Sequence, residues 1–251
     1  MGEAIIARAR AKYKIGVCEK DSKRQAYLKR AYKVRVRNLS DLITDSDILV
    51  LAVKPQDFEN VLGEIKASLR PKHLVISIAA GITSTYIERK LGKGIRVIRT
   101  MPNMPAMVGQ GITAVCRGKY ATAKDVQAAC QLFNCVGQTV VVKENLIDSI
   151  TAVSGSGPAY VFLFMECLIK AARALGLKDD LSVKLINQTL SGSLALILEK
   201  GLDPIELRAK VTSKGGTTQA ATDVFMKYDL NKIIEEALKA AQKRAGELAR
   251  K

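Results

Sequence analysis

Short apolar runs alternate with polar or helix-like stretches over residues 1–142. Ile48 to Val53 is apolar throughout, as expected of a strand buried on both faces. Apolar residues from Phe58 to Ile65 recur at helical spacing, and Leu74 to Ala80 returns to a strand-like run. This rhythm is typical of βαβ units around a parallel sheet. The predicted strands are 14–18, 48–53, 74–80, 95–98, 111–116 and 138–142, and the predicted helices are 21–32, 58–68 and 123–134.

After Lys143 the strand signals end and long helical periodicities take over. Gly176, Gly201 and the Gly215-Gly216 pair interrupt them as helix ends or turns. We therefore expect an α/β domain over 1–142 and an all-helical domain over 143–251. The helices predicted in the second domain are 159–175, 182–200, 204–210, 217–227 and 230–250.

The composition predicts a soluble globular protein, with 48% hydrophobic and 25% charged residues among 251. The longest uninterrupted apolar runs, such as Leu74 to Ala80 and Val161 to Met165, are far shorter than the roughly 20 residues of a membrane-spanning helix. The N-terminus lacks the apolar core of a secretory signal, so we expect a cytoplasmic protein without a membrane partner.

The net charge of +16 admits nucleic acid, an anionic membrane surface or a phosphate-bearing small molecule as partner. Aromatic residues make up only 5% and the cations are spread along the chain, which favours a solvated basic surface and no nucleic-acid partner. A nucleic-acid-binding protein remains the alternative from another functional class. The five cysteines form no C-x-x-C pair, so reduced and mostly buried thiols are expected. His73, the only histidine, has no cysteine partner at metal-ligand spacing, and no metal site is predicted.

A polar loop with two glycines, Val211 to Thr218, stands directly before a predicted helix. Free amides and the positive end of the helix dipole make such a loop a receptor for a carboxylate or phosphate. The alternative is an ordinary capped turn, with Ser213 or Thr217 as the N-cap.

Small residues and prolines follow three of the predicted strands, at Ala52–Pro55, Ile78–Gly81 and Met101–Pro105. Ligand loops of parallel sheets lie outside the carboxyl ends of the strands, so these segments indicate a nucleotide crevice. Ser154 to Tyr160 adds a run of small residues that leads into a proline in a helical first turn. Hydride transfer suits a site of hydroxyls and backbone amides, because the cofactor carries the difficult step.

Taken in order, five strings of this chain resemble the pyrroline-5-carboxylate reductase family over almost the whole length. The resemblance implies a Rossmann-like dinucleotide-binding domain, an all-α C-terminal dimerisation domain, a homodimer or higher homo-oligomer, and reduction of 1-pyrroline-5-carboxylate to L-proline with NADPH or NADH. The strings are Ala52 to Gln56, Ile78 to Thr83, Arg99 to Asn103, Ser154 to Tyr160 and Val211 to Thr218.

The resemblance also assigns residues. Thr218 is expected to hydrogen-bond the ring nitrogen as the catalytic residue. The substrate-binding residues it implies are Glu144, Ser213, Gly215, Gly216, Thr217 and Thr218, and the cofactor-binding residues are Gly2, Ala52, Val53, Lys54, Pro55, Ile78, Ala79, Ala80, Met101, Pro102 and Asn103.

Cofactor choice depends on the segment after the strand at 14–18. Glu19 there could accept from a ribose hydroxyl and favour NADH, whereas Lys20, Lys23 and Arg24 could pair with a 2′-phosphate. We prefer NADPH.

The chain departs from the family pattern at its start. Gly2 corresponds to the last glycine of the family's glycine-rich turn, and we expect the first strand and two earlier glycines to lie upstream of Met1. Lys214 replaces a proline that many members carry. The alternatives are a non-catalytic truncated dimerisation module and a related imine reductase.

Overall fold

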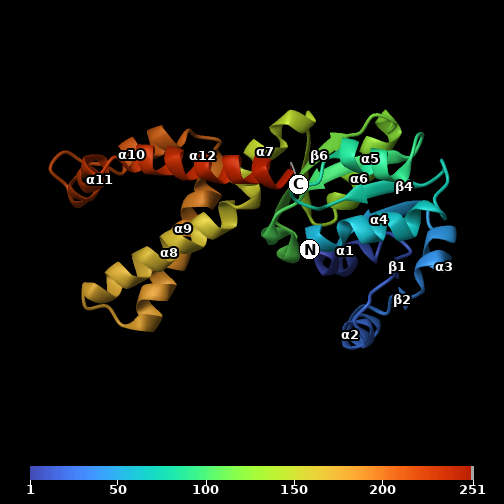
Figure 1. Cartoon of the computed structure of the whole chain (residues 1–251). Helices are drawn as coiled ribbons and strands as arrows, with labels where there is room; N and C mark the ends of the chain where they lie inside the picture. The colour runs from blue at the N-terminus through green and yellow to red at the C-terminus, as the bar shows by residue number, and fades with distance from the viewer. Residues whose placement is uncertain (250–251) are drawn as a thin grey trace. The chain divides into compact units, whose positions relative to one another are not determined.

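The computed structural model describes residues 1–249, and the chain divides by its packing into two compact units (Figure 1). Unit 1 comprises residues 1–158 together with 240–249, and unit 2 comprises Ala159–Lys239. The packing therefore changes at residue 158, whereas the sequence places the boundary at 143. The last half of helix α12 belongs to unit 1.

A five-stranded sheet forms the centre of unit 1, in the order β3-β4-β5-β6-β7. Strands β3, β4 and β5 are parallel, as predicted, but β6 runs antiparallel to β5. The sheet is thus mixed, which corrects the expectation of a parallel one. The segment between β5 and β6 is too short for the crossover that a parallel neighbour requires. The strands are β3 (Ile48–Leu51), β4 (Leu74–Ser77), β5 (Arg96–Met101), β6 (Gly111–Arg117) and β7 (Gly137–Val141).

A separate pair of short parallel strands precedes this sheet. Strand β1 (Gly16–Val17) follows helix α1, and β2 (Arg35–Val36) follows α2. The described chain opens on α1, and β1 is hydrogen-bonded to β2 and not to the five-stranded sheet.

Polar caps start several helices of unit 1. The side chains of Asp21, Asn38, Thr83 and Thr122 each accept an amide of the following turn, which satisfies donors that the helix itself leaves free. Two of these helices, α3 and α5, were not predicted from apolar spacing. The helices are α1 (Gly2–Ala9), α2 (Ser22–Tyr32), α3 (Leu39–Thr44), α4 (Phe58–Lys66), α5 (Ser84–Leu91), α6 (Ala123–Phe133) and α7 (Ile147–Ile150), with short turns η1 (Pro55–Asp57), η2 (Met104–Val108), η3 (Glu144–Leu146) and η4 (Thr151–Gly155).

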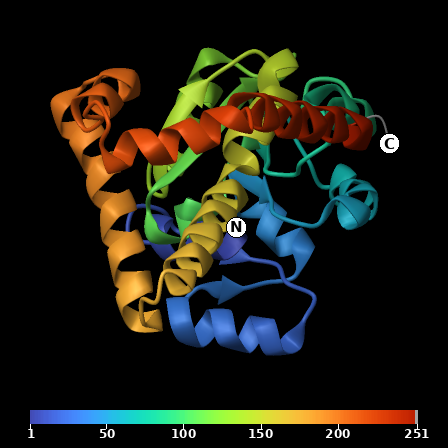
Figure 2. The same ribbon diagram turned by 90° about the vertical axis from the view of Figure 1, so that its left-hand side faces the viewer.

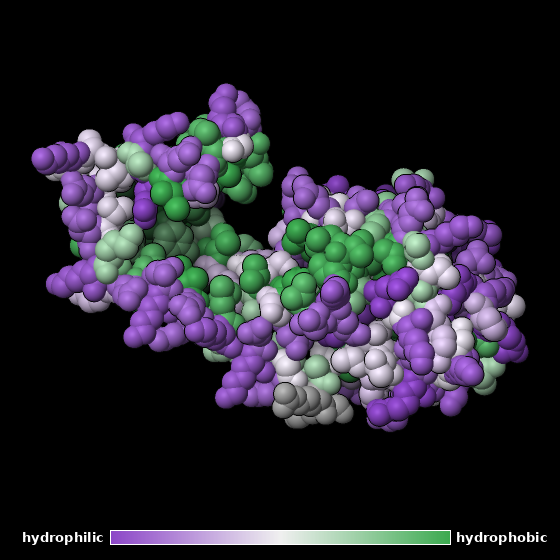
Figure 3. Space-filling model, turned by 90° about the horizontal axis from the view of Figure 1, so that it is seen from above, coloured by the Kyte–Doolittle hydropathy of each residue, from purple (hydrophilic) through white to green (hydrophobic). Residues whose placement is uncertain are grey.

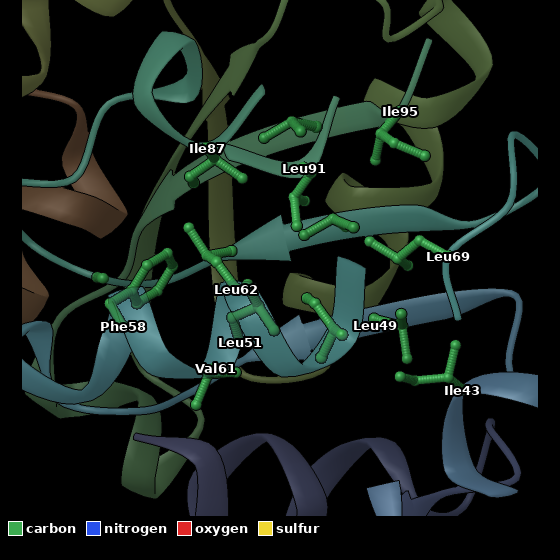
Figure 4. Packing of buried hydrophobic residues seen from close by; sticks show 14 residues of the cluster. Ile43, Leu49, Leu51, Phe58, Val61, Leu62, Leu69, Ile87, Leu91 and Ile95 are labelled. Carbon is green, nitrogen blue, oxygen red and sulfur yellow. The ribbon is translucent and has the colours of Figure 1, made fainter. Parts of the chain in front are cut away.

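Both faces of the sheet are covered. Successive residues of a strand point to opposite faces, so Val75 joins one apolar cluster while its neighbour Ile76 joins another. The first cluster packs α4 and α5 against the sheet, and its members include Phe58 and Leu62 of α4 and Ile87 of α5 (Figure 4). The second packs α1 and α6 against the other face. These layers confirm the Rossmann-like α/β class.

Unit 2 is entirely helical in the described residues, as predicted. Helices α8 and α9 form a hairpin that turns between Ala174 and Asp179 (Figure 2). Pro158 lies in the first turn of α8, where its missing N–H leaves no helical hydrogen bond unmade. The helices are α8 (Gly157–Ala174), α9 (Asp179–Lys200), α10 (Pro204–Lys210), α11 (Thr217–Lys227) and α12 (Leu230–Ala249), of which α8 and α12 cross the unit boundaries.

The helices of unit 2 carry many exposed apolar side chains. Leu163 and Leu194 are 59% and 57% exposed, and apolar residues reach the surface over wide areas (Figure 3). Two stretches, Glu144–Ala174 and Asp179–Lys200, are long and apolar enough to cross a membrane by length and composition alone. The expectation of no such segment rested on uninterrupted apolar runs, which are shorter than these helices.

The cysteine prediction was partly wrong. All five thiols are free, but only Cys116 is buried, and Cys18 and Cys167 are exposed. Burial raises the pKa of Cys116 to about 11, so this thiol stays protonated and inert at neutral pH. His73 is also buried, and its Nδ1 accepts the amide of Arg70 at 2.9 Å.

Candidate functional site

The three predicted cofactor loops follow three adjacent parallel strands. Ala52–Pro55 comes after β3, Ile78–Ala80 after β4, and Met101–Asn103 spans the end of β5. Since parallel neighbours end at the same edge of a sheet, the structure brings these segments side by side. The edge offers small side chains and backbone amides, which is the surface that a flat, phosphate-bearing cofactor requires.

The N-terminus of α1 lies against the same edge. A Cβ built on Gly2 would stand 3.1 Å from the Cβ of Ala52, so a glycine keeps this approach close. Ala4, Ile5 and Ala9 anchor the helix on the sheet. No side chain among the described residues caps the first amides of α1, which leaves them and the positive end of the helix dipole for an anion.

The side chain of Asn103 is engaged within unit 1. Its Oδ1 accepts the amide of Ile112 at 2.9 Å, and its Nδ2 donates to the carbonyl of Ser154 at 3.1 Å. Met101 packs its methyl group against Gly155, where a Cβ would come within 2.7 Å. These side chains fix the loop after β5 on the segment that leads into α8, so a ligand at this loop would meet mainly its backbone.

Glu144, which is partly buried, forms a polar network with two buried residues, and apolar spacing could not reveal it. Its carboxylate accepts the amide of Ser84 at 2.8 Å and an Arg99 guanidinium N–H at 3.1 Å, and it also accepts the Ser84 hydroxyl at 2.5 Å. Burial disfavours the charged carboxylate, but the hydrogen bonds from Ser84 and Arg99 outweigh it and hold the pKa of Glu144 below its usual value. Arg99 is 3% exposed, so Glu144 neutralises a buried charge.

The end of α12 returns to the cofactor edge. Gly81, directly after the loop of β4, has φ +74°, and a Cβ there would stand 3.0 Å from the backbone of Leu248. Gln242 of the same helix donates to the hydroxyl of Ser149 at 2.6 Å. Only a glycine combines this backbone conformation with so close a helix.

Helix α2, which follows β1, contacts α1 through polar and charged side chains. Glu3, in the first turn of α1, accepts the hydroxyls of Tyr32 at 2.6 Å and Tyr27 at 2.8 Å and forms an ion pair with Arg24. These bonds, the one from Tyr32 first, lower the pKa of Glu3 to about 2. Sequence reasoning did not single out Glu3, and its only signal was an acidic residue at a helix start.

The predicted substrate loop, 213–218, lies in unit 2 and precedes α11. The N-cap is Gly216 and not Ser213 or Thr217, and no side chain caps it. Gly215, at φ +73°, donates its amide to Gln219 Oε1 at 2.7 Å, and the Gly216 amide is taken by the Ser213 carbonyl at 3.0 Å.

Two amides at the start of α11, those of Thr217 and Thr218, have no acceptor among the described residues, as expected of a helix's first turn. The cofactor loops belong to unit 1 and this substrate loop to unit 2, while Glu144 lies in unit 1. Unit 1 therefore holds the predicted cofactor loops together with Glu144, and unit 2 holds the predicted substrate loop.

Comparison with known proteins identifies the architecture. The pyrroline-5-carboxylate reductase dimerisation family matches residues 144–248, and the family of coenzyme F420-dependent NADP oxidoreductases matches residues 1–81. The chain is 40% identical over 257 residues to the pyrroline-5-carboxylate reductase of Synechocystis sp., covering all of this chain and 96% of that protein. It is 35% identical over 274 residues to that of Mycobacterium leprae, covering 99% and 93%.

Solved structures agree with these relatives. The pyrroline-5-carboxylate reductase of Coxiella burnetii superposes with a TM-score of 0.91 at 35% identity, covering 99% of this chain and 94% of that one. The pyrroline carboxylate reductase of Plasmodium falciparum, solved with NADP bound, gives a TM-score of 0.89 at 30% identity with the same coverage. This chain therefore belongs to the pyrroline-5-carboxylate reductase family.

Proposed function

We propose that this chain reduces 1-pyrroline-5-carboxylate to L-proline with a reduced nicotinamide dinucleotide, the last step of proline biosynthesis. The observation that carries the proposal is the likeness to pyrroline-5-carboxylate reductases over the whole chain, at 40% identity to the Synechocystis enzyme. The three adjacent strand ends and the uncapped start of α1 fit a dinucleotide, because they offer amides and small side chains.

The cofactor would lie along the loops of unit 1. Gly2 and the first amides of α1 would hold the pyrophosphate, and Ala52–Pro55, Ile78–Ala80 and Met101–Asn103 would line the rest. When bound, it supplies the hydride that adds to the imine carbon, after which the electron pair of the C=N bond rests on nitrogen and takes a proton.

The substrate would be held by the loop before α11. The free amides of Thr217 and Thr218 and the dipole of α11 would bind its carboxylate, together with Ser213. The amides of Gly215 and Gly216 would become available only if Gln219 and the Ser213 carbonyl moved away. Lys214 adds a cation at the same bend.

Thr218 is the proposed catalytic residue. Its hydroxyl would hydrogen-bond the ring nitrogen, orient the imine toward the hydride donor and supply or relay the proton that nitrogen takes up. Glu144 remains a predicted substrate residue. Its hydrogen bonds with Ser84 and Arg99 support a positioning role, in which Glu144 holds the start of α5 and the end of β5 in place.

We also propose that the active form is a cytoplasmic homodimer, or a higher oligomer built from it. The match of residues 144–248 to a dimerisation family supports this assembly. The exposed apolar faces of α8 and α9 need a covering partner, and a second copy whose helices interleave with them would provide it.

A direct assay tests the activity. The purified chain is mixed with 1-pyrroline-5-carboxylate and either NADPH or NADH, and loss of the 340 nm absorbance is followed together with proline formation. Stoichiometric proline formation supports the proposal. Cofactor oxidation with a six-membered cyclic imine acid but not with the pyrroline would identify a related imine reductase. Dimer formation without oxidation of either cofactor would identify a non-catalytic dimerisation module and contradict the proposal.

A further inference from the structure

The loop after β1 holds a carboxylate at the position from which dinucleotide-binding domains recognise the adenosine ribose. In such domains an acidic residue about 20 positions after the glycine turn accepts from the ribose 2′-hydroxyl, whereas basic residues there accommodate a 2′-phosphate. Glu19 is half-buried and occupies this place relative to Gly2 and β1. The inference rests on the proposed function, since it concerns the cofactor of that reaction.

The carboxylate of Glu19 is fixed by the loop itself. Its Oε1 accepts the amide of Lys20 at 2.7 Å and that of Asp21 at 3.1 Å. Gln25 donates to the Glu19 carbonyl at 2.6 Å and holds the main chain in place. Two consecutive amides that could otherwise bind a phosphate oxygen are therefore taken by an anion of the chain.

Arg24, the first arginine after this loop in the sequence, already has partners and is not free to bind a 2′-phosphate. Arg24 forms an ion pair with Glu3 of α1, and its guanidinium lies 4.9 Å from the ring centre of Tyr27. The exposed Lys20 and Lys23 remain, but flexible ammonium groups bind phosphate as point charges, without the two-pronged hydrogen bonding of an arginine. A 2′-phosphate at this loop would thus lie next to a fixed carboxylate, and Arg24 would not be available to bind it.

We infer that Glu19 determines cofactor specificity in this chain, by accepting from a 2′-hydroxyl and opposing a 2′-phosphate, so that NADH binds at least as tightly as NADPH. This inference departs from the preference for NADPH stated from the sequence, and it would distinguish the chain from a relative that was solved with NADP bound. Glu19 would contact the ribose or its phosphate directly. Glu3 would act indirectly, because its ion pair holds the Arg24 guanidinium at α1.

Equilibrium binding tests the inference without relying on turnover. The chain has no tryptophan, so titration calorimetry or the fluorescence of the reduced nicotinamide is the suitable readout. For the unmodified chain we expect a Kd for NADH equal to or below that for NADPH. In Glu19→Gln, the Kd for NADPH should fall about three- to tenfold while that for NADH changes less than about twofold, since one nearby charge is removed.

Glu64→Gln is the matched control. Glu64 lies on α4, close enough to interact electrostatically with Cys18, but outside the loop, and its replacement should leave the ratio of the two dissociation constants unchanged. Tighter NADPH binding than NADH binding by the unmodified chain, or an unchanged ratio in Glu19→Gln, would overturn the inference alone. Failure of every variant to bind either cofactor would overturn both this inference and the proposed function.

Discussion

Thr218 occupies the second position of α11, and its side chain is only partly exposed. We expect Thr218→Ala to lower kcat/KM about 10²- to 10³-fold, because the hydroxyl that orients the imine nitrogen and handles its proton is lost. Thr218→Ser should retain most activity. Thr222→Ala, one turn further along the same helix, is the control for helix damage, since Thr222 bonds only within α11. Steady-state kinetics with a fixed cofactor measure the effect, and unchanged turnover in Thr218→Ala would remove Thr218 from the mechanism.

Glu144 gives a second prediction at the scale of one residue. Glu144→Gln should lower the free energy of unfolding by about 2–3 kcal/mol, because the charge of buried Arg99 loses its partner. The pKa of Glu144 lies below its usual value, so its stabilisation is present above the unfolded pKa of about 4.3 and is lost as the pH falls below it.

Urea unfolding of the unmodified chain and of Glu144→Gln at pH 7 measures the change in the free energy of unfolding. Glu59→Gln is its control, because the ion pair of Glu59 with Lys90 is on the surface and should contribute little. A higher KM for the pyrroline with unchanged stability would instead indicate that Glu144 contacts the substrate.

At the scale of elements, Glu3 joins α1 to α2 through three side chains of α2. We expect Glu3→Gln to lower the melting temperature at pH 7. Since the folded pKa is about 2 and the unfolded one about 4.3, the difference from the unmodified chain should be full above pH 5 and shrink steadily toward pH 2.

Thermal unfolding between pH 3 and 7 checks this linkage between the two helices. Glu235→Gln is the control, because it removes an exposed i,i+4 ion pair on α12. Its difference in melting temperature from the unmodified chain should depend much less on pH. If the difference in melting temperature between Glu3→Gln and the unmodified chain stayed constant down to pH 3, the Glu3 carboxylate would not be the group that stabilises the contact between α1 and α2.

At the scale of the whole molecule, the apolar surface of α8 and α9 predicts self-association. Leu194 is 57% exposed in this surface, and Leu194→Asp places a charge there. We expect this variant to raise the dissociation constant of the dimer at least tenfold. Lys29→Asp on α2 introduces the same side chain at an exposed site outside the apolar faces and should leave the assembly intact. Analytical ultracentrifugation distinguishes the two outcomes, and a monomeric unmodified chain would contradict the predicted dimer.

Local patterns along the sequence determined most elements of this protein. Helices α10 and α11 match their predicted ranges, and β3 and β4 lie within theirs, because apolar periodicity depends on each element's own buried face. The loops with small residues after β3, β4 and β5 could also be predicted from the sequence, because each follows directly after its strand. Helices α3 and α5 were missed because they are short and begin from polar caps.

Only the tertiary structure decided the contacts between distant segments. The antiparallel direction of β6, the bonds of Ser84 to Glu144 across 60 residues, and the approach of Leu248 to Gly81 leave no periodic signal in the sequence. The same holds for Glu3, whose partners lie 21 to 29 residues away on another helix. Periodicity reports which face of an element is buried, whereas the partner of a polar side chain depends on how the whole chain folds around it.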